Sequence, residues 1–560
     1  MVALLIATLH NVTGSYVRKI IGNDGRAILI LTLLWMMGIA VVGVSGDFPL
    51  NDDWAYARGV ASVLNHNALE LDTWPAMTLI TQVGIGIVYG KIFGFSFEVL
   101  RWSTLVNALL GVLIYYSICR RFAGTVPALF TAALLLYNPL FFSLAFTFMT
   151  EVHFLLFVFA CLYSFFRYSE ENRPIHLIAA AILGTLATLL RQPGILVPFS
   201  CGLILALSAP TGLRRLAVLL PVLVAFAALK GYDGWVESYH PHLFRVGGVD
   251  NMLHSLRTYS LGKLVKPLYN VYLYCGLFLA PLLILLLPTV RRSRSLPKVA
   301  AMIIGAVTAI YLTLRPAQFP LGNVFYNLGL GPRTLKGYYS NTVGNPGVPW
   351  WDVLDYLAVA GAVIAAILLI SNVPPIILQG RRPFAKLSPR HLQWSMLAVF
   401  CTGYLVILML IPVSFDRHTL PFIALVSPLV LSSRVPAKRL WVPATVALCI
   451  LGGFSIAATH DYLSWNRSRM GAYHDLTVVR QIPPELLDAG FELNAWAKAG
   501  PERLGGTPPH QMWFVTEDEY AIAFEQLSGY SIIRSYPVYN LLPIGTDRLY
   551  TLKKDTDSAD

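Results

Sequence analysis

The sequence predicts an all-α polytopic membrane protein that ends in a small α/β domain outside the membrane. Of its 560 residues, 56% are hydrophobic and only 13% are charged, whereas a soluble domain carries about 25% charged residues. Apolar runs long enough to cross a bilayer recur along most of the chain and stop near residue 460. We therefore expect a membrane domain over 1–460 and an outer domain over 461–560.

A transmembrane helix needs about 20 apolar residues. A first run covers 27–46, and the basic residues Arg18, Lys19 and Arg26 around its start place the N-terminus on the cytoplasmic side. Including this run, the chain offers thirteen candidate spans: 27–46, 99–118, 125–142, 152–168, 176–190, 194–209, 216–232, 268–290, 299–314, 354–371, 394–412, 419–433 and 440–458.

Two segments need separate interpretation. Arg191-Gln192-Pro193-Gly194 interrupts the apolar run over 176–209, which indicates a tight outer turn between two helices; the alternative is one long kinked helix. Segment 75–97 is apolar enough to span, but counting it would invert every later loop and place the arginines outside. We therefore expect it to lie along the outer interface.

Positive charge in this chain has a topological explanation. The net charge is +12, but the basic residues lie mostly in short loops between apolar runs, where Lys and Arg set the orientation of the spans. No nucleic-acid partner is therefore expected. The six cysteines lie in or beside apolar runs and form no CxxC pair, so we interpret them as packing residues rather than as a disulfide framework.

Thirteen spans and a cytoplasmic N-terminus place the C-terminus outside, together with the long loops 47–98, 233–267 and 315–353. In the outer domain we expect a helix near Glu519–Leu527 and strands at Gln511–Thr516, Ser531–Val538 and Arg548–Leu552. The loop 233–267 is basic and rich in aromatic residues, which suits either an anionic lipid head group or unspecific anchoring to lipid phosphates.

Two acidic clusters are predicted to emerge on this same outer side. Asp52, Asp53 and Tyr56 open the first outer loop, and Glu151 and His153 lie between the third and fourth spans. Ionisable groups at a membrane boundary are costly and mark functional sites, and a carboxylate can take the proton of a sugar or lipid hydroxyl. The carboxylates are therefore candidate catalytic groups.

Structural roles remain open for the same residues. Asp52 could cap an interfacial helix, a position that Asp favours. Glu151 could be a solvated acid at a helix N-terminus, where the helix dipole stabilises it. A single histidine such as His153 near a helix end could bind substrate or only pack.

Three cationic side chains depart from the topology rule. Arg191, Arg417 and His418 lie at outer ends of short turns, where positive charge is otherwise rare. Guanidinium groups match phosphate oxygens, so we expect this set to bind substrate together with Tyr56 and His153. Asp52, Glu151 and His153 have the chemistry to hold a divalent metal, but no ligand spacing supports such a site, and no cofactor is expected to be required.

The motifs in chain order resemble one superfamily of membrane enzymes. They are Asp52-Asp53-Trp54-Ala55-Tyr56, Phe93-Gly94-Phe95 with Val99-Leu100-Arg101, Glu151, Leu190-Arg191-Gln192-Pro193-Gly194, Asp416-Arg417-His418-Thr419-Leu420-Pro421 and Asp461-Tyr462-Leu463-Ser464-Trp465-Asn466-Arg467. This series is similar to the GT-C glycosyltransferases, in particular to protein O-mannosyltransferases and the transferase that adds aminoarabinose to lipid A. His418 stands where Tyr is common in the family.

The resemblance implies an inverting hexosyl- or pentosyltransferase of the cell envelope, in the bacterial inner membrane among membrane lipids. It implies a polyprenyl-phosphate sugar donor and a glycolipid, polysaccharide or protein acceptor on the outer face. Asp52 would act as general base, while Arg191 and Arg417 would stabilise the leaving phosphate. Glu151 would orient the acceptor or hold the arginines, without a covalent sugar–enzyme intermediate.

The main alternative is a transporter or flippase of lipid-linked sugars. Such a protein needs charged residues near the bilayer midplane and often has internal repeats. Here the key charges cluster at one face, and the sequence shows no repeat. An outer soluble domain also has little use in a transporter, so the sequence favours the transferase.

Overall fold

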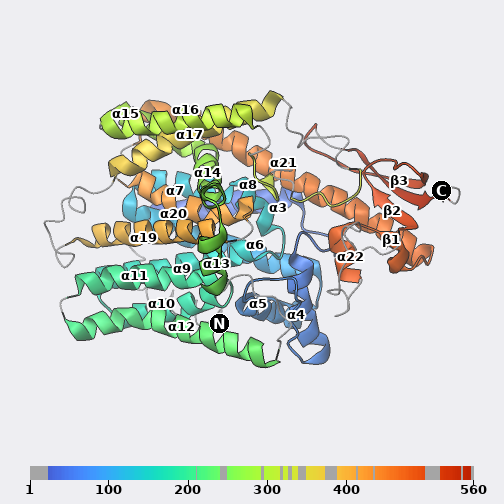
Figure 1. Ribbon diagram of the computed structural model, residues 1–560, viewed down its shortest axis with the longest axis horizontal. Helices are drawn as coiled ribbons and strands as arrows, with labels where there is room; N and C mark the ends of the chain where they lie inside the picture. Colours follow the sequence, from blue (N-terminus) through green and yellow to red (C-terminus); the bar gives the residue numbers. More distant parts are fainter. Residues whose placement is uncertain are drawn as a thin grey trace.

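A computed structural model describes residues 23–209, 211–239, 249–291, 295–315, 319–325, 331–337, 349–372, 387–411, 414–432, 436–497, 518–543 and 546–555. Helices form most of the molecule, and a small sheet lies at one end beside the C-terminus (Figure 1). The predicted fold class, a helical membrane protein with a small C-terminal α/β part, is confirmed.

The helices begin close to where the apolar runs begin. In the first half they are α3 (Asn23–Val42), α4 (Asp53–His66), α5 (Ile80–Phe93), α6 (Phe97–Phe122), α7 (Thr125–Leu136), α8 (Pro139–Ala145), α9 (Thr150–Glu171), α10 (Pro174–Thr188), the short 3₁₀ helix η1 (Gln192–Ile195), α11 (Leu196–Ser208) and α12 (Gly212–Tyr239). The second half continues with α13 (Val249–Thr258), α14 (Leu261–Phe278), α15 (Ala280–Arg291), α16 (Ser295–Leu314), α17 (Pro349–Asn372), α19 (Pro389–Leu410), η5 (Asp416–Thr419), α20 (Leu420–Leu431), α21 (Trp441–His474) and α22 (Phe491–Ala497).

Each predicted span coincides with one helix or with a bent helix pair. In the described chain, seven helices are long and apolar enough to cross a membrane, and nine spans result if each of two bent pairs counts as one. The pairs are α7 with α8, bent by 61°, and α14 with α15, bent by 88°. Shorter apolar helices occupy the other predicted spans, so the count of thirteen stays a prediction.

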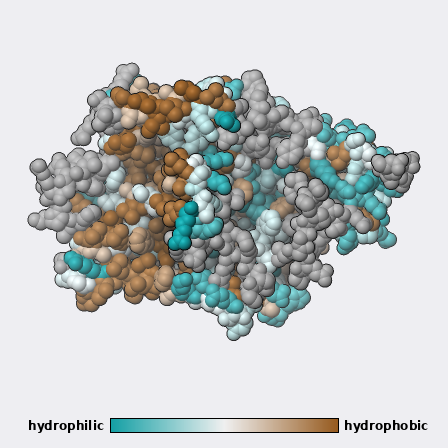
Figure 2. Space-filling model, in the orientation of Figure 1, coloured by the Kyte–Doolittle hydropathy of each residue, from teal (hydrophilic) through white to brown (hydrophobic). Residues whose placement is uncertain are grey.

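The helical part exposes apolar side chains in stripes. On α16, Ile303, Val307, Ile310 and Leu314 are each more than half exposed, and their spacing of three or four residues puts them on one face. Hydrophobic side chains gather over the helices, and hydrophilic ones gather at the end that carries the sheet (Figure 2). Because such a surface is unfavourable in water, the chain is an integral membrane protein.

Local capping fixes where the central helix α6 begins. The Ser96 side chain accepts a hydrogen bond from the backbone N–H of Val99 at 3.1 Å, as expected for an N-cap serine. At the other end of α6, Arg120 pairs with Asp24 at 2.8 Å. α6 packs along α9, which is largely buried, so the two helices form the centre of the bundle.

The C-terminal part contains a four-stranded sheet with the order β1-β2-β4-β3. β1 (Leu487–Asp488) runs parallel to β2 (Tyr520–Ala523), and the other neighbours pair antiparallel. β3 (Tyr530–Pro537) and β4 (Arg548–Lys554) confirm two predicted strands. The third predicted strand, Gln511–Thr516, lies outside the described residues.

The predicted helix near Glu519–Leu527 is wrong. The residues Tyr520–Ala523 form β2 instead, hydrogen-bonded to β1 on one side and to β4 on the other. Neighbouring strands on both sides satisfy the backbone of this segment, and Ala521, Ile522 and Ala523 are buried there. Tertiary pairing therefore overrides the local helical propensity.

α21 connects the bundle to the C-terminal part without a break. It runs for 34 residues, from Trp441 to His474, and so passes through the boundary expected at residue 461, which remains a prediction as a domain division. In the part of α21 that follows residue 461, Arg469 forms a fully buried ion pair with Glu492 of α22 at 2.7 Å. Arg469 also donates to the Pro49 carbonyl at 3.3 Å, which ties α22 to the first loop.

Candidate active site

Asp52 lies immediately before α4 with both carboxylate oxygens in use. Oδ2 accepts a hydrogen bond from Nη2 of Arg417 at 2.8 Å, and Oδ1 accepts one from the indole Nε1 of Trp74 at 3.0 Å. Asp52 occupies the N-cap position of α4, but its side chain makes no capping hydrogen bond. Its side chain is 14% exposed, so the carboxylate remains accessible at the edge of the site.

Asp53 connects two loops through its carboxylate. Its Oδ1 accepts the backbone N–H of Leu50 at 2.7 Å, and its Oδ2 accepts that of Phe148 at 3.1 Å. Burial raises the pKa of Asp53 to about 7, although both N–H bonds act in the opposite direction. Asp53 thus fastens the first loop to the segment that leads into α9.

Glu151 lies in the first turn of α9 between two guanidinium groups. Its Oε1 accepts a hydrogen bond from Nη1 of Arg191 at 2.9 Å and lies 3.4 Å from Nε of Arg417. The Glu151 side chain is 1% exposed, so it is not the solvated helix-end acid that was one interpretation of the sequence. A buried carboxylate of this kind needs its cationic partners.

Arg191 occupies the interruption predicted between two helices. α10 ends at Thr188, η1 covers Gln192–Ile195, and α11 begins at Leu196. Gly194 folds back against Ala187 so closely that an added Cβ would lie 2.4 Å from the Ala187 carbonyl carbon. Glycine is therefore required at this position, and the tight turn carries Arg191 to Glu151.

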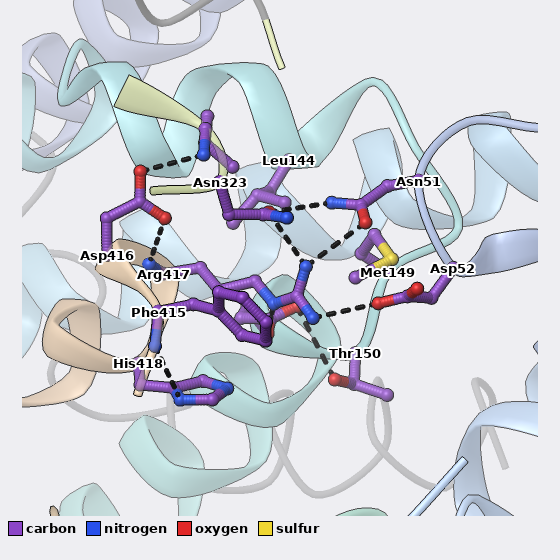
Figure 3. Close-up of polar contacts among 12 residues, drawn as sticks. Asn51, Asp52, Leu144, Met149, Thr150, Asn323, Phe415, Asp416, Arg417 and His418 are labelled. Atoms are coloured by element: carbon purple, nitrogen blue, oxygen red, sulfur yellow. Dashed lines mark hydrogen bonds and ion pairs between the residues drawn. The ribbon is translucent and has the colours of Figure 1, made fainter. Parts of the chain in front are cut away.

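Arg417 lies at the centre of the cluster (Figure 3). Besides Asp52 and Glu151, its guanidinium contacts two amides: Nη1 donates to Oδ1 of Asn323 at 2.8 Å and to Oδ1 of Asn51 at 3.2 Å. The side chain is 5% exposed. Burial opposes its charge, but Asp52 and Glu151 outweigh burial and raise the pKa of Arg417 above its ordinary value.

Asp416 positions the loop that carries Asn323. Its carboxylate accepts backbone N–H groups of Val324, Phe325 and Arg417, the first at 2.7 Å and the last at 2.6 Å. Burial raises the pKa of Asp416 to about 7, against the effect of these N–H groups. No sequence pattern pointed to Asn323, and Asp416 was recognised only as a motif neighbour of Arg417.

His418 and Tyr56 lie beside the cluster. Burial, followed by the charges of Arg191 and Arg417, lowers the pKa of His418, so the ring is neutral. Its Nδ1 accepts the N–H of Phe415 at 3.3 Å, which leaves the proton on Nε2. Tyr56 is 2% exposed; burial and then the Asp52 charge raise its pKa well above 10.

The structure does not bring His153 to the cluster. Its Nε2 lies 3.0 Å from the Thr104 hydroxyl, and its Nδ1 lies 2.7 Å from the Asn107 amide nitrogen, both on α6. The ring therefore joins two buried helices. Among the residues that the structure describes, no group of three or more His, Cys, Asp or Glu side chains is placed to hold a metal ion.

One family model matches part of the chain. Residues 85–232, about a quarter of the 560-residue chain, match the model of the dolichyl-phosphate-mannose-protein mannosyltransferases. This segment includes Glu151 and Arg191 but not Asp52 or Arg417. Among curated proteins, no sequence matches the chain.

Solved structures give likenesses at low identity. ArnT from Cupriavidus metallidurans bound to undecaprenyl phosphate is 13% identical, with 95% of this chain and 98% of that chain covered and a TM-score of 0.45. The S. cerevisiae Pmt1-Pmt2 complex bound to the sugar donor is 17% identical over 39% and 34%, with a TM-score of 0.31. AglB from Archaeoglobus fulgidus, in complex with an inhibitory peptide and a dolichol-phosphate, is 14% identical over 80% and 59%, with a TM-score of 0.39. The match to the mannosyltransferase family confirms the predicted resemblance of this chain to the GT-C membrane glycosyltransferases.

Proposed function

We propose that this protein is an inverting glycosyltransferase that moves a sugar from a polyprenyl-phosphate donor to an acceptor hydroxyl or amine at the outer face of a bacterial inner membrane. One observation carries the proposal: the Asp52 carboxylate lies 2.8 Å from the Arg417 guanidinium, which shares Glu151 with Arg191. A base and two fixed cations thus lie side by side, as displacement at a sugar phosphate requires.

Asp52 is the general base in this proposal. The oxygens of Asp53 both accept backbone N–H groups, and Glu151 is 1% exposed between two arginines. Asp52 has the most exposed side chain of the three, at 14%. Arg417 and Trp74 each hold one of its two carboxylate oxygens, so its orientation at the edge of the site is fixed.

The reaction is a single displacement. The acceptor oxygen or nitrogen attacks the anomeric carbon on the face opposite the phosphate, while its proton passes to Asp52. The bond between the anomeric carbon and the phosphate oxygen breaks, and its electron pair leaves with the lipid phosphate. Because one displacement inverts the configuration, the step needs no covalent intermediate.

Arg191 and Arg417 receive the leaving phosphate. Arg191 donates one N–H to Glu151, and a guanidinium has five donors in a rigid fork. Fixed donors aimed at developing charge contribute about 3 kcal/mol each in comparable sites. In this arrangement Glu151 holds both guanidinium groups in place, and the neutral His418 adds an Nε2–H donor.

Support for the donor class comes from the matched family, whose name specifies a dolichyl-phosphate mannose. A polyprenyl phosphate has the same chemistry: an apolar chain for the membrane and a phosphate for an arginine pair. The donor that the protein consumes identifies the sugar and therefore the type of transferase, hexosyl or pentosyl.

The test measures consumption of a panel of radiolabelled polyprenyl-phosphate sugars by the purified protein in nanodiscs, with a membrane extract as acceptor. Wild type is compared with Asp52→Asn and with the control Asp24→Asn, since Asp24 pairs with Arg120 at the opposite end of α6. We expect wild type and the control to consume one donor. Asp52→Asn should be slower by about 100-fold or more, the usual contribution of a general base.

Equal rates for wild type and Asp52→Asn would exclude Asp52 as the base. Failure of wild type to consume any donor would contradict the transferase proposal. Transport of the same lipid-linked sugars in proteoliposomes would then support the flippase alternative.

A further inference from the structure

We propose that Trp74 forms an acceptor subsite for a sugar ring, so that the group that receives the transferred sugar is itself a saccharide. This inference rests on the proposed function and adds the substrate class. Trp74 is 47% exposed although its indole Nε1 donates to Oδ1 of Asp52 at 3.0 Å. An exposed aromatic ring thus lies within one hydrogen bond of the proposed base.

Trp74 belongs to a group of three aromatic rings. Its ring centroid lies 5.9 Å from that of Trp54 on α4 and 5.5 Å from that of Phe491 on α22. Trp54 and Phe491 are 6.0 Å apart and nearly perpendicular, at 80°. Trp54 is 2% exposed, so Trp74 presents the outer surface of a supported platform to which the C-terminal part contributes one ring.

The platform is held in place on both sides of Trp74. On one side, Asp72 accepts the backbone N–H of Trp74 at 2.8 Å and is paired with Arg58 at 2.8 Å. On the other side, the Ala76 carbonyl accepts from Gln192 at 3.0 Å. A ring fixed before binding loses little conformational entropy when the ligand arrives.

The two oxygens of Asp52 separate acceptor from donor. Oδ1 faces Trp74, and Oδ2 faces Arg417. If the donor phosphate lies at the arginines, a ligand on Trp74 approaches the same carboxylate from its other oxygen. A single displacement needs this arrangement, because attacking and leaving groups lie on opposite sides of the anomeric carbon.

The chemistry of the platform suits a sugar ring. A pyranose has a face of C–H groups, which an indole ring covers, and an edge of hydroxyl groups, which need polar partners. Here the indole Nε1 donates to the Asp52 carboxylate, and Asp72, which pairs with Arg58, accepts the backbone N–H of Trp74. An acyl chain on the same ring would cover the Asp52 carboxylate without forming a hydrogen bond to it, which is unfavourable.

The test uses initial rates of transfer in nanodiscs with the donor that the panel experiment selects, methyl glycosides as saccharide acceptors and a Ser/Thr peptide as the competing acceptor. The variants are Trp74→Ala, Trp74→Phe and the control Trp102→Ala, since Trp102 is 38% exposed on α6. Trp74→Ala should raise the acceptor KM by about tenfold, equivalent to about 1.4 kcal/mol, with the donor KM unchanged. Trp74→Phe keeps a ring but no N–H, so it should restore the acceptor KM at a lower kcat.

Transfer to the peptide but to no saccharide would overturn the inference. It would also fail if Trp74→Ala raised the KM of donor and acceptor equally, or if Trp102→Ala had the same effect as Trp74→Ala. Loss of folding in Trp74→Ala would leave Trp74→Phe to decide through its split between KM and kcat. Absence of donor consumption in wild type would instead contradict the proposed function.

Discussion

Asp52 and Arg417 are 365 residues apart in the sequence, and their side chains meet at 2.8 Å. The first loop and the segment before α20 therefore complete the site only in the folded chain. Arg417 also contacts Asn51 and Asn323, so one guanidinium joins three separate segments of the protein.

Replacing Arg417 with Lys should abolish most of the transfer activity. A lysine ammonium is a point charge and cannot meet the four side chains that the planar guanidinium contacts. We expect the rate of donor consumption by Arg417→Lys to fall by about 100-fold or more. The control Arg467→Lys removes hydrogen bonds to the carbonyls of Val42, Gly43 and Ser45 and should retain its rate; a fivefold effect or less for Arg417→Lys would contradict the central role of this residue.

Glu151→Gln should destabilise the protein strongly. The variant removes the carboxylate that the buried Arg417 and the partly buried Arg191 share, and removal of one partner from a buried ion pair costs about 3–5 kcal/mol. The control Glu170→Gln breaks the more exposed pair with Arg121 and should cost about 1 kcal/mol or less. Unfolding measured by denaturant titration in detergent should separate the two variants, and equal midpoints would show that the buried cluster stores no such energy.

Asp53 should make stability depend on pH. Its pKa of about 7 in the fold lies above the ordinary value of 3.8, so the stability that Asp53 contributes is fully present below the unfolded pKa and is lost as the pH rises through about 7. Asp53→Asn stays neutral throughout. From about pH 5 to about pH 8, the unfolding temperature of wild type should therefore fall more than that of Asp53→Asn.

Asp416 shares the raised pKa of about 7 and should account for a further part of the same slope. Thermal unfolding of wild type, of each single variant (Asp53→Asn and Asp416→Asn) and of the double variant across this pH range checks both assignments. Parallel profiles for wild type and the double variant would contradict them.

Breaking the Arg469–Glu492 pair should loosen the attachment of the C-terminal part. Both side chains are 0% exposed, so Glu492→Gln should lower the free energy of unfolding by about 3–5 kcal/mol. Because Arg469 also holds the Pro49 carbonyl, transfer should slow as well. Arg480→Gln, which breaks an exposed pair with Asp475, should change neither quantity; a Glu492→Gln variant that also changed neither would exclude a support role for α22.

Four charged side chains of the candidate site could be selected from the sequence, because topology and chemistry pointed to the same residues. Asp52, Glu151, Arg191 and Arg417 were selected as charges at one membrane face, and the structure brings all four together. His153 was grouped with Glu151 by proximity in sequence. Residues two apart on a helix lie on different faces, so the helical period alone could have separated His153 from Glu151.

Other features depend on contacts that no local pattern encodes. Asn323 is held in the site because the next two residues, Val324 and Phe325, donate their backbone N–H groups to Asp416. These hydrogen bonds join residues that are more than 90 positions apart in the sequence. The bends between α7 and α8 and between α14 and α15 did have a local signal, since Pro139 and Pro281 stand at the start of the second helix of each pair. Hydropathy averaged over about 20 residues hardly changes at a single proline, so each bent pair was predicted as one span.

The unbroken α21 gives this protein a mechanical property. A helix of 34 residues is a rod of about 50 Å, embedded in the bundle at one end and joined to the sheet at the other. Because the helix is continuous, a tilt of its membrane half would displace the sheet at its other end. A fluorophore on the sheet would therefore report the tilt of the membrane half, and a ligand that immobilised the sheet would restrict that tilt.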